Sequence, residues 1–440
     1  MKKNEVYEVV VTDMNNMGFG IAHIDGMAVF VDGGVTGDRL NIRIIKTASS
    51  YAVARIEEVL SASDKREQDP CPLRRCGGCT LGHITRGYEL ELKKSFVRAS
   101  FHKQGIEAEV KDVVTDGRRT GYRNKVQMPV EGGKYGYYAK HSHEIIPCGK
   151  CLLSSEQFSD VIAFTASYRF PADPQLRHIY IRYGEKTGEM MLTLVTRLDR
   201  IKGEEDFVKD VTAAFPMLKS IVVNTNAEDT NVILGKKSRA IYGKDEIIDV
   251  LCGCTFAVSS HSFYQVNRNV AELLYEKAIE LAAESGPKRV ADLYCGAGTI
   301  GISFAKKHPG TAVYGLEVVP EAVENAKKNA ERNGIKNAEF LCADAETADL
   351  CGIDVCIVDP PRKGISEALA EKIVKTGIKR LVYVSCNHET LARDAKYFLS
   401  HGYNMGEITP YDMFPRTGSV ESVALFVRTE SAVSASSEKE

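Results

Sequence analysis

The 440-residue sequence lacks any long apolar run. A helix that crosses a membrane needs about 20 consecutive apolar residues, and no segment of this chain approaches that length. An apolar stretch is also missing after residues 1–5, which are mostly polar or charged. We therefore expect a cytoplasmic protein without a membrane partner.

A net charge of either sign is nearly absent, since 57 lysines and arginines stand against 59 aspartates and glutamates, for a formal charge of −2. A strongly basic chain would indicate a nucleic-acid partner, and this balance does not. Basic residues nevertheless gather between Arg74 and Lys140, where fourteen of them stand beside seven acidic residues. Such a segment is either a solvated surface or a surface that contacts phosphates, and the sequence leaves both open.

Disulfides are not expected in a reducing compartment, so the twelve cysteines are better explained by metal ligation, catalysis or core packing. Cys71, Cys76 and Cys79 lie close together, with two glycines between the second and the third. This spacing is typical of a soft-metal site, and Cys151 or Cys148 could supply a fourth thiolate. Four thiolates suit an iron–sulfur cluster and a zinc ion equally, so the residues leave both open.

Strand patterns dominate the first 260 residues. Residues 4–60 alternate apolar and polar positions between glycine turns, which predicts a small antiparallel barrel of about five strands. Residues 61–69 are polar and predict a linker. From about residue 125 to about 260, segments such as 178–183 alternate again. We interpret this region as an antiparallel sheet that forms a wall of a substrate cleft or, equally, as a spacer.

The last third of the chain alternates strands and helices. Residues 288–301 are typical of a strand, a glycine turn and the start of a helix, and the next strand, 312–317, ends in Glu317. A long amphipathic helix is expected from Pro320 to about Asn333. This order predicts a doubly wound nucleotide-binding domain, in which Glu317 would accept hydrogen bonds from ribose hydroxyls.

The glycine pattern GxGxxG fits a nicotinamide-dependent dehydrogenase as well as an S-adenosylmethionine (SAM) methyltransferase. Acidic residues separate the two classes. Asp292 lies four residues before Gly296, Asp344 follows the third strand, and the tetrapeptide DPPR that starts at Asp359 ends the fourth. Dehydrogenases have no evident use for that DPPR corner, so the pattern favours SAM by analogy with known sites.

A cysteine follows the next strand of this series. The run 380–384 is short, β-branched and flanked by charge, which puts Cys386 at the carboxyl end of a buried parallel strand. Ligands bind at that edge of open α/β sheets. A lone cysteine is more often a core residue, but beside the DPPR corner it predicts a nucleophilic thiol over the cofactor site.

With these motifs the chain resembles a known family, the TRAM-containing RNA uracil-5-methyltransferases, and among them those that methylate 23S ribosomal RNA and carry a [4Fe-4S] cluster. The TRAM domain is an OB-like RNA-binding barrel. The resemblance covers nearly all 440 residues. It rests on residues 18–39, CGGC at 76–79, GYRNKVQ at 121–127, SFYQVN at 262–267, DLYCGAGTIG at 292–301, DPPRKG at 359–364, VSCN at 384–387 and FPRTGSVE at 414–421.

Carried over position by position, the resemblance implies that Cys386 is the nucleophile and Glu421 the base. Carbon 5 of uracil is too weak a nucleophile to attack a sulfonium, so a thiolate first adds to carbon 6 and creates an enolate that takes the methyl group. A base must then remove the proton of carbon 5 so that the thiol can leave. A stacked uracil exposes neither face, so the target must be single-stranded or flipped out.

The same resemblance implies a cofactor site and a metal site. The residues expected around SAM are Gln265, Tyr294, Gly296, Glu317, Asp344 and Asp359. The residues expected to hold the [4Fe-4S] cluster are Cys71, Cys76, Cys79 and Cys151, with zinc as the alternative metal.

Three features depart from the family pattern. The first cysteine spacing is one residue shorter than usual, and Gly82 stands in place of a common glutamine; both bear on the geometry of the cluster. Ser419 replaces a common histidine two residues before Glu421, which leaves proton removal to that glutamate with less help.

The expected fold class is α/β plus β, in three domains and a tail. They are a TRAM or OB-like RNA-binding barrel at 1–62, a strand-rich central domain with the iron–sulfur site at 63–265, a Rossmann-like SAM methyltransferase domain at 266–429 and a disordered tail at 430–440.

The expected function is methylation of carbon 5 of one uridine in 23S ribosomal RNA by a monomer. A transfer-RNA uracil-5-methyltransferase is the first alternative, although relatives of that type usually lack the cluster. A non-catalytic iron–sulfur RNA-binding protein is the second, and intact Cys386, Glu421 and Gln265 argue against it.

Overall fold

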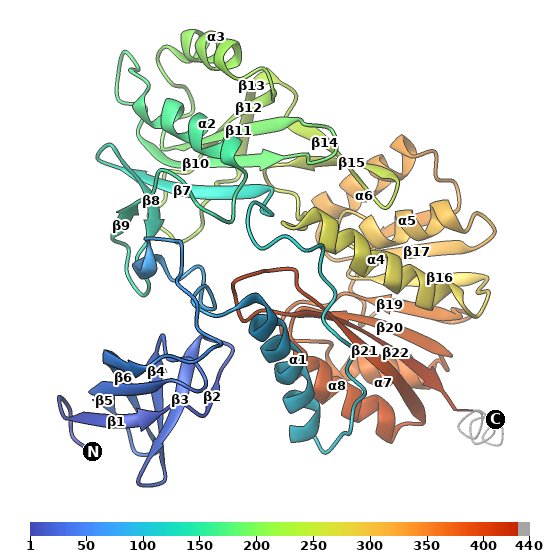
Figure 1. Ribbon diagram of the computed structural model, residues 1–440. Coiled ribbons are helices and arrows are strands. Elements are labelled where there is room, and N and C mark those ends of the chain that lie inside the picture. The colour runs from blue at the N-terminus through green and yellow to red at the C-terminus, as the bar shows by residue number, and fades with distance from the viewer. Residues whose placement is uncertain (430–440) are drawn as a thin grey trace.

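Three large β-sheets follow one another along the chain (Figure 1). The computed structural model describes residues 1–429, so the tail expected at 430–440 lies outside it. Among the helices of the described residues, none has both the length and the apolar character that a membrane span requires.

The first sheet has six strands. Across the sheet they are β1 (Val6–Val10), β5 (Arg39–Thr47), β6 (Tyr51–Ser61), β4 (Met27–Asp32), β3 (Phe19–Ile24) and β2 (Asp13–Met14). Alternate apolar side chains, such as Leu40, Ile42 and Ile44, form its buried face.

The prediction of an antiparallel barrel of about five strands was wrong in two respects. In the six-stranded sheet β4 runs parallel to β6, and the sheet is not closed. The eleven-residue β6 is long enough to pair with β5 over most of its length and with β4 over residues 51–55, which the alternation of side chains does not reveal. The order of the described strands ends at β1 and β2, so the sheet is a half-barrel rather than a closed one.

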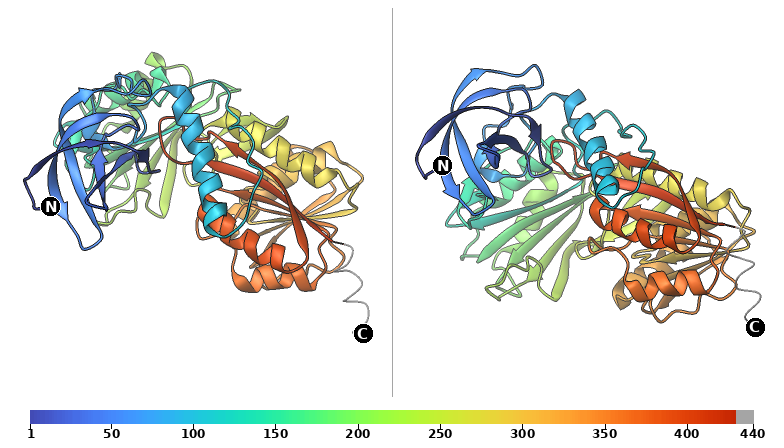
Figure 2. Two further views of the ribbon diagram at one scale, coloured as in Figure 1. Left: turned by 60° about the horizontal axis from the view of Figure 1, so that its bottom comes forward. Right: turned by 90° about the horizontal axis from the view of Figure 1, so that it is seen from below.

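The segment between the first and second sheets contains η1 (Arg74–Cys76) and α1 (Arg86–Lys103). Helix α1 lies against the C-terminal domain rather than the central sheet (Figure 2). Its Val97 and Phe101 are fully buried in a core that also contains residues of the third sheet. The segment 110–114 then bridges to strand β21, so this part of the chain is integral to the C-terminal domain.

The second sheet has seven strands. Across the sheet they are β13 (Lys237–Gly243), β12 (Leu218–Thr225), β11 (Met190–Thr196), β10 (Leu176–Tyr183), β7 (Lys125–Glu131), β8 (Lys134–Tyr138) and β9 (Ile145–Pro147). Helices α2 (Glu156–Ser167) and α3 (Glu204–Ala214) accompany it. The predicted antiparallel pairing fails between β11 and β12, which run parallel because α3 carries the chain back across the sheet.

A hairpin of β14 (Glu246–Leu251) and β15 (Cys254–Ser259) leads through α4 (Arg268–Ala283) into the third sheet. The strand order is β18 (Ala338–Cys342), β17 (Ala312–Glu317), β16 (Arg289–Leu293), β19 (Val355–Val358), β20 (Arg380–Ser385), β22 (Glu421–Arg428) and β21 (Tyr403–Tyr411). The first five strands are parallel, and β22 is antiparallel to β20.

Helices cover both faces of the third sheet (Figure 1). Helices α4, α5 (Thr299–Lys307) and α6 (Pro320–Arg332) share one core with it. Helices α7 (Glu367–Lys375), α8 (His388–Ser400) and α1 share the other. The predicted doubly wound domain is confirmed, and its five parallel strands direct their carboxyl ends toward a common edge.

Candidate active site

A cavity of about 730 Å³ lies at the carboxyl ends of strands β16, β17, β19 and β20. This volume falls in the range of small-molecule sites. Every residue that the sequence suggested for catalysis or SAM binding lines it, namely Gln265, Tyr294, Gly296, Glu317, Asp344, Asp359, Cys386 and Glu421. The sequence therefore identified residues that the fold brings together, although their individual roles remain predictions.

The turn between β16 and α5 forms the floor of the cavity. Tyr294, Gly296 and Gly298 all have positive φ angles, and a side chain at Gly298 would lie 2.9 Å from the ring of Phe340. Asp292 accepts a hydrogen bond from the Gly301 amide at 2.8 Å through Oδ2, which holds the turn against the start of α5. Its buried Oδ1 has no hydrogen-bond partner among the described residues.

The acidic end of β17 fixes the same turn from the other side. Glu317 accepts hydrogen bonds from the backbone amides of Gly296 at 3.1 Å and Val319 at 3.0 Å. Its carboxylate thus stands beside the glycine turn and lines the cavity. This is the position from which an acid contacts a ribose in doubly wound folds.

The DPPR corner and the cysteine loop are joined by hydrogen bonds. Asn387 donates to the Arg362 carbonyl at 3.0 Å, and Thr390 donates to the same oxygen at 3.3 Å. Asn387 also caps α8, because its Oδ1 accepts from the Glu389 amide at 3.0 Å. The positive end of a helix therefore lies next to Cys386.

Strand pairing brings the candidate nucleophile and base together. The last paired residues of β20 and β22 are Ser385 and Ser422. One further step in this antiparallel register sets Cys386 opposite Glu421. Burial, followed by the charges of Glu421 and Asp359, raises the pKa of the Cys386 thiol to about 11.

Glu421 is buried and carries an altered pKa. Loss of hydration raises the pKa of its carboxyl group to about 8, the charge of Asp359 acts in the same direction, and Arg362 opposes both. A carboxylate whose pKa lies close to neutral suits general-base chemistry. This position was implied by the family pattern, whereas the register with Cys386 is a finding of the fold.

Some lining residues were not assigned a role from the sequence. Lys125 begins β7 and lines the cavity, so the central sheet contributes to its wall, which is one of the two interpretations that the sequence left open. Burial, Arg182 and Arg123 lower its pKa to about 8. Phe263 also lines the cavity and is 71% exposed. Both residues lie within motifs on which the family resemblance rests. Their place in those motifs was the sequence feature that could have identified them as site residues.

The cysteines expected to bind metal lie near one another. Burial raises the pKa of Cys79 to about 11, and the charges of Cys151 and Cys71 contribute in the same direction. Cys76 is affected by the same two neighbours. Among residues 1–429, however, no three histidine, cysteine, aspartate or glutamate side chains are arranged to hold a metal ion. The donor set is chemically suited to a soft metal, but the predicted cluster is not confirmed.

Comparisons with known proteins agree with this architecture. Residues 2–56 match the TRAM domain family, and residues 284–392 match a methyltransferase domain family. A protein of Halalkalibacterium halodurans named as an uncharacterized RNA methyltransferase is 38% identical over 450 residues, which cover 97% of both chains. One of Clostridium acetobutylicum with the same description is 36% identical over 455 residues, which cover 98% of both chains.

A solved structure extends the similarity. The tRNA (uracil-54, C5)-methyltransferase of Pyrococcus abyssi, in complex with S-adenosyl-L-homocysteine, superposes with a TM-score of 0.79 at 27% identity. The match covers 96% of this chain and 100% of the other. This chain belongs to the TRAM-containing RNA uracil-5-methyltransferase family. The chain is accordingly an RNA methyltransferase with a SAM-binding domain, and the cavity lies at the edge of the third sheet where doubly wound folds bind ligands.

Proposed function

We propose that this methyltransferase transfers the methyl group of SAM to carbon 5 of one uridine in 23S ribosomal RNA, as a cytoplasmic monomer and through a covalent adduct with Cys386. The observation that carries the chemistry is the register of β20 and β22, which sets Cys386 opposite Glu421 at a cavity with the residues expected around SAM. A thiol and a carboxylate on either side of a small planar ring are what the addition and elimination steps require.

The reaction begins with Cys386. Its thiolate forms a bond to carbon 6 of uracil, and the electron pair of the carbon 5–carbon 6 double bond attacks the methyl group, which leaves the sulfonium of SAM as S-adenosylhomocysteine departs. The α8 N-terminus and Arg362 favour the thiolate, whereas burial and Glu421 oppose it. At neutral pH the thiol of Cys386 is therefore mostly protonated.

Glu421 completes the reaction. Its carboxylate takes the proton of carbon 5, the electrons of that bond restore the double bond, and the carbon 6–sulfur bond breaks to release the Cys386 thiolate. Its burial prevents water from competing for the site. Proton removal is consequently the step that depends on the position of β22, because this strand carries Glu421.

The cysteine-rich segment, residues 69–82, supports a metal-binding role. We propose that Cys71, Cys76, Cys79 and Cys151 hold a [4Fe-4S] cluster, with zinc as the alternative. Such a group would tie the segment between the first two sheets to the loop that follows β9 of the second sheet. Iron, acid-labile sulfide and zinc analysis of anaerobically purified protein distinguishes the two metals, and the absence of all three refutes the proposal.

Two classes of RNA are candidate substrates for this enzyme. The cysteine motif and the family pattern favour 23S ribosomal RNA, since relatives that act on transfer RNA usually lack the cluster. Transfer RNA is the second candidate, because the solved relative with a TM-score of 0.79 is named as a tRNA (uracil-54, C5)-methyltransferase. The catalytic steps are the same in both cases, so the substrate must be tested directly.

The deciding experiment offers 23S, 16S and transfer-RNA transcripts separately to anaerobically purified protein with labelled SAM. Digestion to nucleosides identifies the product, and Cys386→Ala is the matched inactive control. We expect 5-methyluridine in 23S RNA with the wild-type protein alone. Methylation confined to transfer RNA would establish the second candidate. RNA binding and SAM binding without methyl transfer would leave a non-catalytic RNA-binding protein.

A further inference from the structure

The loop between β21 and β22, residues 412–420, leads directly to Glu421. Two of its residues, Phe414 and Ser419, line the active-site cavity. Neither the cofactor site nor the nucleophile belongs to this loop, because those residues come from other strands and turns. The contacts that fix the loop therefore affect the position of Glu421 more than the positions of SAM or Cys386.

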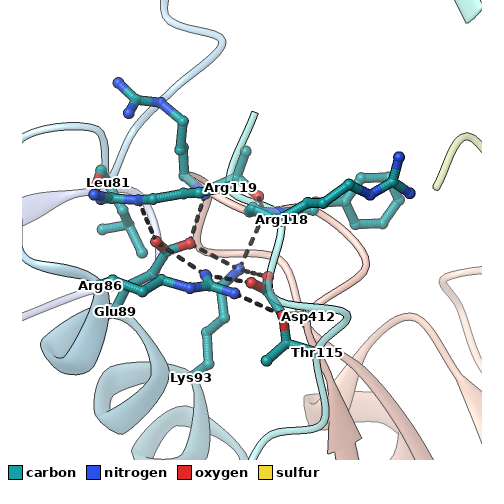
Figure 3. Close-up of polar contacts among 12 residues, drawn as sticks. Leu81, Arg86, Glu89, Lys93, Thr115, Arg118, Arg119 and Asp412 are labelled. Carbon is teal, nitrogen blue, oxygen red and sulfur yellow. Dashed lines mark hydrogen bonds and ion pairs between the residues drawn. The ribbon is translucent and has the colours of Figure 1, made fainter. Parts of the chain in front are cut away.

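The start of the loop is anchored on helix α1 by a buried cluster of charges (Figure 3). Asp412 forms ion pairs with Lys93 and Arg86. Lys93 also donates to the Phe414 carbonyl at 3.0 Å, and Glu89 accepts from the Arg416 amide at 2.5 Å. The side chains of Glu89, Lys93 and Asp412 are all 0% exposed, so the ion pairs that Lys93 forms with the two carboxylates are little screened by solvent.

The middle of the loop is anchored on the cysteine-rich segment. The Arg416 guanidinium pairs with Asp69, which also accepts from the Cys71 amide at 2.9 Å. The Leu81 amide donates to the Arg416 carbonyl at 2.9 Å. Arg416 is 1% exposed. This single residue thus joins segments on both sides of Cys76 and Cys79 to the loop that precedes the base.

The space for this ion pair depends on Gly82. A Cβ atom at Gly82 would lie 2.4 Å from Asp69 Oδ2 and 2.8 Å from Arg416 Nη2. The family pattern commonly has a glutamine at this position. Because the chain has a glycine here, the ion pair occupies the space that a side chain would fill. Any larger residue at this position would separate the two charges.

We propose that Arg416 is a positioning residue, which through its pair with Asp69 fixes the loop 412–420 and thereby holds Glu421 where it removes the proton of carbon 5. This inference rests on the proposed function. Arg416 touches neither RNA nor SAM in this role. Its loss slows the elimination step, while thiol addition and methyl transfer continue.

The test uses the covalent intermediate. In Arg416→Gln the methylated adduct between Cys386 and RNA forms but resolves slowly, so a denaturant-resistant protein–RNA species that carries label from SAM accumulates. We expect kcat to fall roughly 10- to 100-fold, as for a misplaced catalytic group, with the Kd for SAM unchanged. Glu421→Gln supplies the reference for a blocked elimination, and Arg416→Lys restores part of the rate.

Arg197→Gln is the matched control, since Arg197 forms an ion pair with Asp229 and neither residue lines the active-site cavity. Asp69→Asn and Gly82→Ala disturb the same pair while Arg416 remains, so they carry the test if Arg416→Gln does not fold. Equal losses of adduct and turnover, or a change confined to the KM for RNA, would overturn the positioning role. If Glu421→Gln itself forms no adduct, the proposed function fails instead.

Discussion

Three carboxyl groups, of which Asp292 and Glu421 are buried and Asp359 is half-buried, give the active-site cavity its electrostatic character. Burial raises the pKa of Asp292 to about 7, that of Asp359 to about 6 and that of Glu421 to about 8. Each group would ionise more readily beside a cation. The sulfonium of SAM is such a cation, whereas the sulfur of S-adenosylhomocysteine is neutral.

SAM affinity is therefore expected to rise with pH more steeply than the affinity for S-adenosylhomocysteine. Between about pH 6 and 8 the carboxyl groups lose their protons, and only SAM gains a new attraction at sulfur. Calorimetric titration of both compounds across this range measures the two slopes. Asp359→Asn should reduce the difference between them, and identical slopes in the wild-type protein would contradict the argument.

Glu421 also makes the stability of the protein depend on pH. Its pKa is raised from 4.5 to about 8 on folding, so the folded chain holds this proton more tightly than the unfolded chain. The free energy of unfolding should fall as pH rises through this window, by at most about 1.4 kcal/mol per pH unit. Urea denaturation of wild type and Glu421→Gln at several pH values tests this, since the amide does not titrate. A difference in stability that is constant with pH would refute the expectation.

At the scale of elements, the glycine turn between β16 and α5 shapes the cavity proposed to bind SAM. Gly298 and Gly286 both have positive φ angles, of 78° and 60°. A methyl group at Gly298 would collide with Ile302 and Phe340, whereas nothing lies within 4 Å of one at Gly286. Alanine variants at the two positions therefore share the backbone strain, and only the variant at Gly298 is also crowded.

Gly298→Ala should destabilise the protein more than Gly286→Ala. Both variants carry the strain of a left-handed alanine, about 1–2 kcal/mol, and crowding adds roughly 1–3 kcal/mol at Gly298. SAM affinity should fall in Gly298→Ala alone, because neighbouring Ala297 and Thr299 line the cavity. Chemical denaturation and SAM titration measure the two effects. Equal destabilisation would show that the turn accommodates the methyl group.

The sequence predicted elements better than it predicted their partners. Helix α6 was expected from Pro320 to about Asn333 and runs to Arg332, because a proline at its first turn and an amphipathic pattern are local signals. The parallel pairing of β11 with β12 and of β4 with β6 leaves no local signal, since alternation specifies a face and not a direction. For the same reason Cys386 was placed at a strand end from its own sequence, whereas its register with Glu421 required the fold.

The whole molecule gives a third interpretation of the basic segment from Arg74 to Lys140. Several of its charges pair with acidic residues inside the protein rather than facing solvent or phosphate. Lys93 and Arg86 bind Asp412, and Arg119 binds Glu89 (Figure 3). Arg119 also binds Glu67. Charge counted along the sequence cannot show this, because the acidic partners lie as far away as the C-terminal domain.

The first sheet docks on the cysteine-rich segment through a close backbone approach. A Cβ atom at Gly18 would lie 2.2 Å from the Thr80 carbonyl oxygen, whereas Gly26, in the same sheet, has nothing within 4 Å. Their φ angles are nearly equal, 81° and 80°. Gly18→Ala and Gly26→Ala therefore carry the same strain and differ in the contact between domains.

Gly18→Ala should push the first sheet away from Thr80, and Gly26→Ala should not. Because the TRAM domain is proposed to hold RNA, we expect the KM for RNA to rise roughly 10-fold in Gly18→Ala, as when a single binding contact of about 1.4 kcal/mol is lost. The Kd for SAM should not change, since its site lies on the third sheet. Steady-state kinetics and SAM titration of both variants measure this, and faster proteolysis within residues 62–70 would report the displaced sheet. If both alanines raise the KM equally, backbone strain rather than the docking contact is responsible, and the sheet need not be fixed in place for RNA to bind.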